Sequence, residues 1–249
     1  MSQRTYSQYT QDYDTSSQSF KKSKSYKKVQ KHKPKASMSA GSIAKVVRRE
    51  LYKNSETKHC NLAGNEVAIS TINTGTGLVF ISQPYPTVGA EPTQRVGNKI
   101  QPVGYSFKAV YNNNNDIPIV IRRIILQVED GENTNNDILN NLFEGNSNNV
   151  DTYDTGTMDS LIRKVNREGF KVLKDDIIKL GTNNGGQRYE VDKLFVKLGG
   201  SQTYRESAST HAVNDRIVCI HIARQSDADE SLGSTVEMSY LVDFYFKDL

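Results

Sequence analysis

The residues with the clearest chemical potential form a short basic segment near the N-terminus. Residues 21–35 hold eight lysines and no acidic residue, with the aromatic Tyr26 among them. Ammonium groups neutralise phosphates and an aromatic ring can stack on a base, so this composition predicts binding to single-stranded nucleic acid. A nuclear-localisation signal or a solubilising tail would have a similar composition. The candidate nucleic-acid-binding residues are Lys21, Lys22, Lys24, Lys27, Lys28, Lys31, Lys33 and Lys35.

A second basic group follows in residues 42–54, SIAKVVRRELYKN. Ser42 is a suitable N-cap, and the apolar residues recur at helical spacing while the basic residues lie elsewhere around the helix. We therefore expect a short basic amphipathic helix that docks on the folded domain or on a neighbouring copy. A helix that lies on a membrane is usually longer and more apolar, so no membrane partner is expected. Arg48 and Arg49 are secondary candidates for nucleic-acid contact.

Few residues could support catalysis. Cys219 and His221 lie two apart in a strand-like segment and therefore share a face, as a thiol and its base would. Their neighbours are Ile and Val, so packing in the core is the preferred interpretation. The acidic residues of segment 227–230 could bind a hard cation, but a solvated turn is favoured. Phosphate-loop, nucleophile-elbow and zinc-protease motifs are missing from the sequence. The prediction is a non-enzymatic protein with no catalytic residue, metal site or cofactor.

The charge of the chain is divided unevenly. Residues 1–49 contain 12 Lys/Arg against 2 Asp/Glu, whereas residues 50–249 contain 20 against 26, so the net charge of +4 combines a basic arm with an acidic body. Residues 1–20 are mostly Ser, Thr, Gln and Tyr, which bury too little apolar surface to offset the entropy of ordering. We expect a disordered basic arm over residues 1–41, a short basic helix and linker over 42–63, and one folded domain over 64–249.

Length and composition also limit the class of protein. The body is long enough for one large all-β domain, with 36% of the whole chain hydrophobic. There is no apolar run of about 18 residues and no basic-then-apolar start, so the sequence predicts neither a membrane span nor classical secretion. Two cysteines, Cys60 and Cys219, are too few for a disulfide framework or a cysteine zinc cluster.

Alternation of apolar and polar residues from residue 64 onward predicts β-strands. The last segment, from Val236 to Phe246, alternates most clearly. In residues 117–128 the apolar phase changes at Arg122 and Arg123, which predicts a β-bulge or a bend there. About eight strands, with no helix between most of them, fit a β-sandwich or jelly roll better than a parallel α/β fold. The expected strands cover residues 67–71, 78–80, 99–111, 117–128, 170–180, 189–198, 217–223 and 236–246.

One long excursion interrupts the strands. Residues 129–157 contain eight asparagines and a single short apolar helical patch at 138–143, so a surface loop of the kind that often carries recognition is expected. Residues 158–168, MDSLIRKVNRE, space their apolar side chains as a helix does and predict a packed surface helix.

Four segments, taken in order, resemble a known family. GAEPTQRVGNKIQPVGYSFKAVY (89–111) contains an "R-x-G-x-K-I" entry to a strand, formed by Arg95, Gly97, Lys99 and Ile100. Residues 124–139 resemble that family's strand leading into a long polar loop, 166–180 its "R/F-x-V-L-x-D" strand, and 191–207 its Phe/Lys-rich strand followed by Tyr. With the polar start, the lysine-rich arm and the short basic helix, the chain resembles the capsid proteins of small circular Rep-encoding single-stranded DNA viruses. It is also similar to the single jelly-roll coat proteins of satellite RNA viruses.

The resemblance covers most of residues 21–247 and implies both fold and function. It implies an all-β fold, a single eight-stranded antiparallel jelly-roll sandwich with short helices in loops. It also implies a structural protein that self-assembles into a small icosahedral shell, most simply of sixty copies, around a single-stranded genome that is circular DNA in these viruses. The arm here is dominated by lysine where many relatives carry denser arginine runs.

The same resemblance implies partners and a location. A virion protein of this family would meet a host-cell receptor, and assembly in the host nucleus would require a nuclear import receptor. Two other functions remain open from the sequence. One is a nucleic-acid-binding accessory or movement protein that acts as a small oligomer, and the other is a jelly-roll carbohydrate-binding module that uses the asparagine-rich loop.

Overall fold

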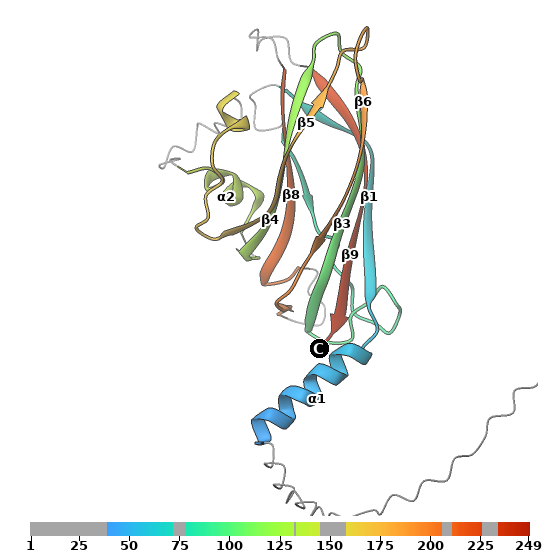
Figure 1. The fold of residues 1–249 in the computed structure, drawn as a ribbon, viewed down its shortest axis with the longest axis vertical. Helices are drawn as coiled ribbons and strands as arrows, with labels where there is room; N and C mark the ends of the chain where they lie inside the picture. The colour runs from blue at the N-terminus through green and yellow to red at the C-terminus, as the bar shows by residue number, and fades with distance from the viewer. Residues whose placement is uncertain (1–38, 72–77, 132, 145–157, 206–210, 226–233) are drawn as a thin grey trace, which may run out of the picture. The chain divides into compact units, whose positions relative to one another are not determined.

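The computed structural model describes residues 39–71, 78–131, 133–144, 158–205, 211–225 and 234–249. The chain divides into two compact units, residues 1–45 and 46–249. Most of the second unit consists of two antiparallel β-sheets packed face to face (Figure 1). In the described part of the chain, no helix is long and apolar enough to cross a membrane.

The elements follow the predicted order, with strands of up to 15 residues. The helical elements are α1 (Ala40–Asn54), α2 (Asn135–Asn140) and a 3₁₀ helix, η2 (Met158–Leu161). The strands are β1 (Lys58–Ser70), β2 (Val79–Ser82), β3 (Lys99–Asn113), β4 (Ile119–Asp130), β5 (Phe170–Leu180), β6 (Tyr189–Lys197), β7 (Gln202–Thr203), β8 (Asn214–Gln225) and β9 (Thr235–Asp248).

The strand order identifies the fold. Sheet 1 has the order β1-β9-β3-β6, with the two-residue β7 paired to β3, and sheet 2 has the order β2-β8-β4-β5. With β7 set aside, eight strands are shared equally between two sheets whose pairings are all antiparallel. Strands adjacent in the sequence are mostly placed in different sheets, which is the double Greek-key arrangement of a jelly roll. The predicted fold class is confirmed.

The main core lies between the two sheets. Alternate residues of β3 and β9 point into it, among them Phe107, Tyr111, Val236 and Met238, all fully buried. Fully burying one such apolar side chain contributes about 1.5–3 kcal/mol. The apolar residues of the alternating pattern that predicted these strands therefore face the main core, and the residues between them face the outer side of sheet 1.

Sheet 2 is buried on both faces, and this corrects the predicted bulge at Arg122 and Arg123. Ile121 and Ile125 of β4 face the main core, whereas Ile124 faces a second cluster on the outer side of the sheet. The pairing of β4 with β8 runs without a register shift, and the shift against β5 lies between Ile125 and Leu126. The apparent change of phase arises because apolar residues occupy both faces of a regular strand.

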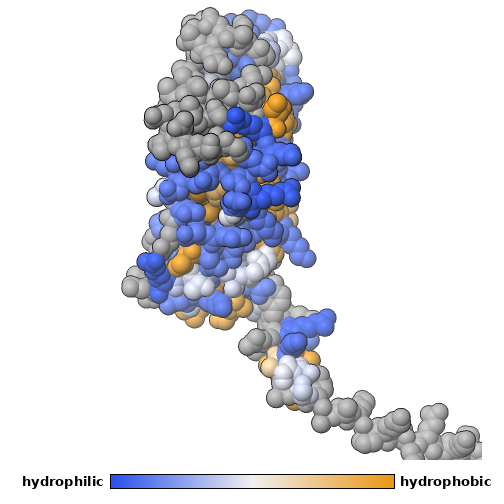
Figure 2. Space-filling model, turned by 90° about the vertical axis from the view of Figure 1, so that its left-hand side faces the viewer, coloured by the Kyte–Doolittle hydropathy of each residue, from blue (hydrophilic) through white to orange (hydrophobic). Residues whose placement is uncertain are grey.

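The excursion between β4 and β5 covers the outer face of sheet 2. Ile138, Leu142, Phe143 and Val165 pack onto that face as the other half of the second cluster. Figure 1 shows α2 and its neighbouring segment on this side of β4 and β8, and Figure 2, which faces the same side, shows a mostly hydrophilic surface. Part of the predicted recognition loop is thus a structural cover, and residues 145–157 lie outside the described residues.

The prediction of a helix over residues 158–168 is wrong. Only the 3₁₀ helix η2 forms there, and Ile162, placed on the packed face by the prediction, is 81% exposed. The backbone carbonyls of Ser160 and Arg163 accept hydrogen bonds from the Arg122 guanidinium, at 2.7 and 2.8 Å. These two hydrogen bonds fasten the segment to β4.

The first strand begins earlier than expected. Residues 58–63, placed in a linker by the sequence analysis, form the start of β1. One extra residue between Gly64 and Val67 shifts the register of β1 against β9, and Glu66 there has a φ of 52°. This β-bulge reverses the inward and outward phase, so no single alternation runs through the whole strand.

Candidate nucleic-acid and assembly surfaces

The predicted lysine-rich arm lies outside the described residues. Lys21, Lys22, Lys24, Lys27, Lys28, Lys31, Lys33 and Lys35 all precede residue 39, where the description begins. Their role in nucleic-acid binding stays a prediction from the sequence.

The predicted basic helix is confirmed as α1, with an earlier start. It begins at Ala40, and Ser39 rather than Ser42 supplies the cap, because the backbone N–H of Ser42 donates to Ser39 Oγ at 3.3 Å. Arg49 is exposed, and the side chain of Arg48 is not described. The apolar side chains of Ile43, Val46 and Val47 are about half exposed.

A row of three rings crosses the outer face of sheet 1. Phe195 of β6, Tyr245 of β9 and His59 of β1 lie along it, with ring centroids 6.1 Å apart for Phe195–Tyr245 and 5.9 Å for Tyr245–His59. The row can form because β3 places Gly104 beneath it. A Cβ at Gly104 would lie 2.3 Å from the Phe195 ring, so only glycine leaves room for that ring to cover the strand. Phe195 remains 62% exposed.

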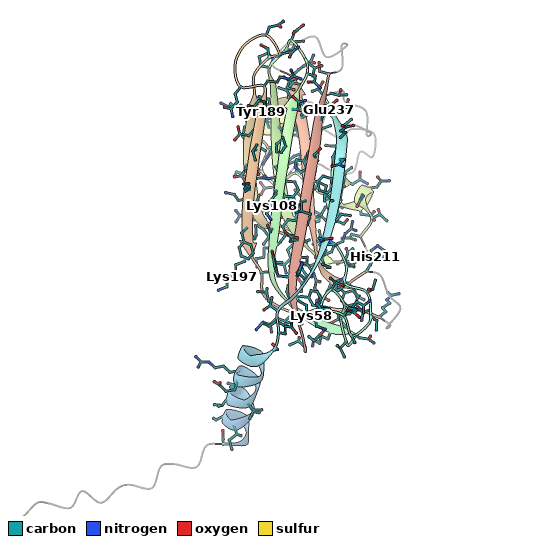
Figure 3. The ribbon with its side chains drawn as sticks, turned by 90° about the vertical axis from the view of Figure 1, so that its right-hand side faces the viewer. Lys58, Lys108, Tyr189, Lys197, His211 and Glu237 are labelled. Atoms are coloured by element: carbon teal, nitrogen blue, oxygen red, sulfur yellow. The ribbon has the colours of Figure 1, made fainter. Side chains whose placement is uncertain are left out.

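Three lysines flank the rings. Lys193 of β6 lies directly opposite Lys108 of β3, and Lys197 lies opposite Gly104. Figure 3 looks onto this face and shows Lys108 in the middle of the sheet and Lys197 towards one end. We call the six residues the ring–lysine patch: His59, Lys108, Lys193, Phe195, Lys197 and Tyr245.

The patch is electropositive. Asp243 of β9 is the partner of Lys108, with its Oδ2 3.5 Å from the lysine Nζ. Within the described part of the chain, Lys193 and Lys197 form no ion pair. Two like charges directly opposite each other on neighbouring strands destabilise a sheet, so the Lys193–Lys108 pair is not explained by folding stability alone.

Sequence reasoning missed this patch, although a signal was present. In YEVDKLFVK (189–197) the residues of one face are Tyr, Val, Lys, Phe and Lys, and this is the exposed face. An exposed strand face with rings and lysines departs from the usual polar exterior. What could not be read from one strand is the register that aligns Phe195 with Tyr245 and His59.

A buried arginine joins the two sheets at their β5 and β6 edges. Arg123 of β4 is 2% exposed, and its guanidinium pairs with Asp176 of β5 at 2.6 Å and with Asp192 of β6. It also lies over the Phe107 ring, 5.5 Å from the centroid. Burial raises the pKa of Asp176, but hydrogen bonds from Arg123 and Lys174 outweigh it and hold the pKa below its usual value. One cation thus ties sheet 2 to sheet 1.

The neighbouring Arg122 faces the other side of sheet 2. It forms a bidentate pair with Asp175, at 2.8 and 2.6 Å, in addition to its bonds to the two carbonyls of the excursion. Bidentate pairs of this kind are strong and directional. Arg122 therefore fastens the covering segment to β4, and Arg123 fastens sheet 1 to the same strand.

Two of the motif residues that carried the family resemblance, Arg95 and Ile100, are buried in this chain. Arg95 is fully buried, with its guanidinium carbon 4.0 Å from the centroid of the Tyr204 ring. Its Nη1 donates to the carbonyl of Gly97. Two segments that are 109 positions apart in the sequence thus meet in one cation–π contact. Arg95 holds the entry to β3 and is not available to a ligand.

The Cys219–His221 pair is part of the core, as predicted. Both side chains are fully buried, and the Sγ atom lies 4.0 Å from the ring nitrogens. Burial raises the pKa of the Cys219 thiol, whereas burial and the charge of Arg123 lower the pKa of His221 to about 3. An activated pair needs a thiolate and an imidazolium, and both shifts favour the neutral forms. The imidazole Nε2 instead shares a 2.9 Å hydrogen bond with the Tyr111 hydroxyl.

The buried His221 should make the stability of the fold sensitive to acid. The pKa of His221 is about 3 in the fold, below the value of about 6.5 for an unfolded histidine. The contribution of this neutral imidazole to the free energy of unfolding is therefore fully present above pH 6.5 and is lost as the pH falls from there towards 3. The expected loss is about 1.4 kcal/mol per pH unit. Urea unfolding of wild type and His221→Gln at pH 7, 6 and 5 measures it. The variant should lose less stability on acidification, and parallel pH profiles for the two proteins would contradict the prediction.

Comparison with known proteins adds only distant similarities. No protein-family model and no curated protein matches the chain. Solved structures of infectious bursal disease virus, strains Gx and Gt, each share 7% identity with it, with TM-scores of 0.36 and 0.31. The matches cover 77% and 76% of this chain and 33% and 32% of those chains, so it spans about a third of their length.

A third similar structure is VP1 of the trichodysplasia spinulosa-associated polyomavirus in complex with sialylated glyco-oligomers. Its identity is 8% and its TM-score 0.22, and the match covers 78% of this chain and 94% of that chain. These values carry no functional argument. The jelly-roll assignment rests on the strand order of this chain.

Proposed function

We propose that the chain is a structural, non-enzymatic coat protein of a small virus that assembles into an icosahedral shell. The observation that carries the proposal is the jelly-roll strand order, β1-β9-β3-β6 against β2-β8-β4-β5, in a chain whose sequence places a lysine-rich arm before the folded unit. Through the arm, the shell packages single-stranded nucleic acid, and of the two genome types in the families that the chain resembles we propose circular DNA. The protein then belongs in the virion, and in the host nucleus during assembly.

A shell of this kind needs repeated weak contacts rather than a catalytic site. Closed symmetry multiplies each heterologous contact, so interfaces that are weak alone form a stable assembly. The two sheets differ in what covers their outer faces. Sheet 2 is covered by its own excursion, whereas the outer face of sheet 1 exposes Val110, Val191 and Tyr189 as well as the ring–lysine patch. Among the described residues, no segment packs over this face of sheet 1 as the excursion does over sheet 2.

The division of charge supports packaging. The arm is strongly basic and residues 50–249 are net acidic, so binding to phosphates is concentrated in the arm and charge on the body stays limited. Phosphate neutralisation by lysine does not depend on base sequence, which suits the enclosure of a whole genome.

The assembled mass tests the proposal. Size-exclusion chromatography of the full-length protein, with light scattering and the ultraviolet absorbance ratio, should give a particle of about 1.7 MDa of protein for sixty copies of the 27.9 kDa chain, with a nucleic-acid signature. Sequencing of the nuclease-protected strand would identify what is packaged. A monomer or small oligomer across salt and pH would overturn the shell and favour an accessory protein.

A further inference from the structure

We propose that the ring–lysine patch on sheet 1 is a second binding site for single-stranded nucleic acid, on the folded body itself. The inference rests on the proposed function and extends it, because the sequence places nucleic-acid contact only in the arm and α1. The ligand class is a single strand whose bases stack on exposed rings while lysines neutralise its phosphates.

The rings supply the stacking surface. Phe195 is 62% exposed, and His59 is exposed beside the half-buried Tyr245, so the row offers ring surface to solvent across β6, β3, β9 and β1. Four strands at the usual spacing span about 14 Å. Gly104 leaves space for the Phe195 ring at the middle of the row, since any larger residue there would displace that ring. Exposed aromatic rings contribute to single-strand binding without base specificity, because every base has a π face.

The lysines supply the electrostatic part. Lys193 and Lys108 lie directly opposite each other beside the row, and Lys197 lies at its β6 end. Among the described residues, one carboxylate, that of Asp243, forms an ion pair with a lysine of the patch, Lys108. A phosphate between Lys193 and Lys108 would relieve the repulsion of a like-charge pair. The same charge pattern argues against binding of the chain's own basic arm to the patch, since these lysines would repel it.

The charge identifies the ligand as an anion, and the rings identify it as one with flat aromatic groups. A second copy of the chain would bring mixed charges to this face, whereas a single-stranded nucleic acid combines both required features in every nucleotide. Two large aliphatic side chains exposed on this face, Val110 and Val191, lie beyond the lysine pair, on the side away from the rings.

Crosslinking of the full-length protein tests the site. The probe is a homothymidine single strand substituted with 5-iodouracil, which is irradiated with the protein and followed by peptide mass spectrometry. Crosslinks are expected in peptides that contain Phe195 or Tyr245, in addition to any in the arm. Crosslinks confined to residues 1–38 would overturn the inference and leave the proposed packaging function intact.

Affinity measurements with matched variants give a second readout. By fluorescence anisotropy with a labelled homothymidine strand, the Phe195→Ala/Tyr245→Ala variant should bind roughly ten-fold more weakly, within the range for loss of stacking rings. Lys193→Gln/Lys197→Gln should reduce the steepness of the salt dependence by about 1.4. Tyr189→Ala is the control, because Tyr189 is an equally exposed aromatic on the same face of β6 but lies outside the patch.

The outcomes separate this inference from the proposed function. Unchanged affinity in both patch variants, with particles that still contain nucleic acid, contradicts the second site alone. Unchanged affinity together with lost assembly assigns the patch to contact between copies and also overturns the inference. A full-length protein that forms no particle overturns the shell, while the oligonucleotide assays still decide whether the patch binds single strands.

Discussion

Deletion of residues 1–35 is expected to remove most of the nucleic acid from the purified particle while the jelly roll stays folded. The eight lysines of the arm each contribute about 0.7 to the steepness of the salt dependence for a single strand, so the arm alone should contribute about −6 to the slope of log affinity against log salt. With that slope, a four-fold rise in salt weakens binding on the order of a thousand-fold. The truncated protein should retain only the shallow dependence of the remaining basic residues.

Two measurements and one matched variant check this result. The absorbance ratio of the particle reports its nucleic-acid content, and thermal unfolding reports the integrity of the body, which should be unchanged. Replacement of the eight lysines by arginine keeps the charge and should preserve packaging, whereas replacement by glutamine should reproduce the deletion. Equal nucleic-acid content in the wild-type and truncated proteins would show that the arm is not the packaging element.

Replacement of Arg123 by methionine is expected to cause a large loss of stability for a single substitution. It leaves Asp176 and Asp192 close together at the junction of the sheets without their cation, and it removes the contact with the Phe107 ring. Loss of one partner of a fully buried pair costs about 3–5 kcal/mol. Because these carboxylates are 27% and 25% exposed, solvent reduces the expected cost to about 2–3 kcal/mol. The melting temperature should fall by about 5–10 °C.

Matched variants separate the buried charge from packing. Lys174 also pairs with Asp176, at 3.0 Å, but its side chain is 48% exposed, so Lys174→Gln should cost less than about 1 kcal/mol. Conversion of both aspartates to asparagine in the Arg123→Met background removes the uncompensated charges and should recover much of the loss. If Arg123→Met melts like the wild type by calorimetry, the arginine does not tie the sheets together.

The sequence alone located most of the strands of this protein. Residues 99–111, 170–180 and 236–246 were predicted within a few residues of β3, β5 and β9. In β3 and β9 one face is buried and the other meets solvent or a polar layer, which gives a clear alternation. It also determined the charge division between arm and body, since that depends on composition alone. The burial of Cys219 and His221 followed from their apolar neighbours in the same strand.

Where two layers cover one strand, the sequence pattern was ambiguous. Arg122 and Arg123 looked like a break in β4 because both faces of that strand are apolar, and the actual bulge lies elsewhere. Residues 158–168 had a helical pattern, but their carbonyls bind Arg122 from a distant strand instead. Local periodicity contains no information about which other segment will cover a face.

Tertiary structure alone decided which distant residues meet. Arg95 stacks on Tyr204, Arg123 joins Asp176 to Asp192, and Phe195 aligns with Tyr245 and His59 only through the register of four strands. Each contact depends on strand order and register, which are set by long-range packing between the sheets rather than by any one segment. For this reason the arm could be proposed as a nucleic-acid site from composition, whereas the ring–lysine patch became visible only in the folded sheet.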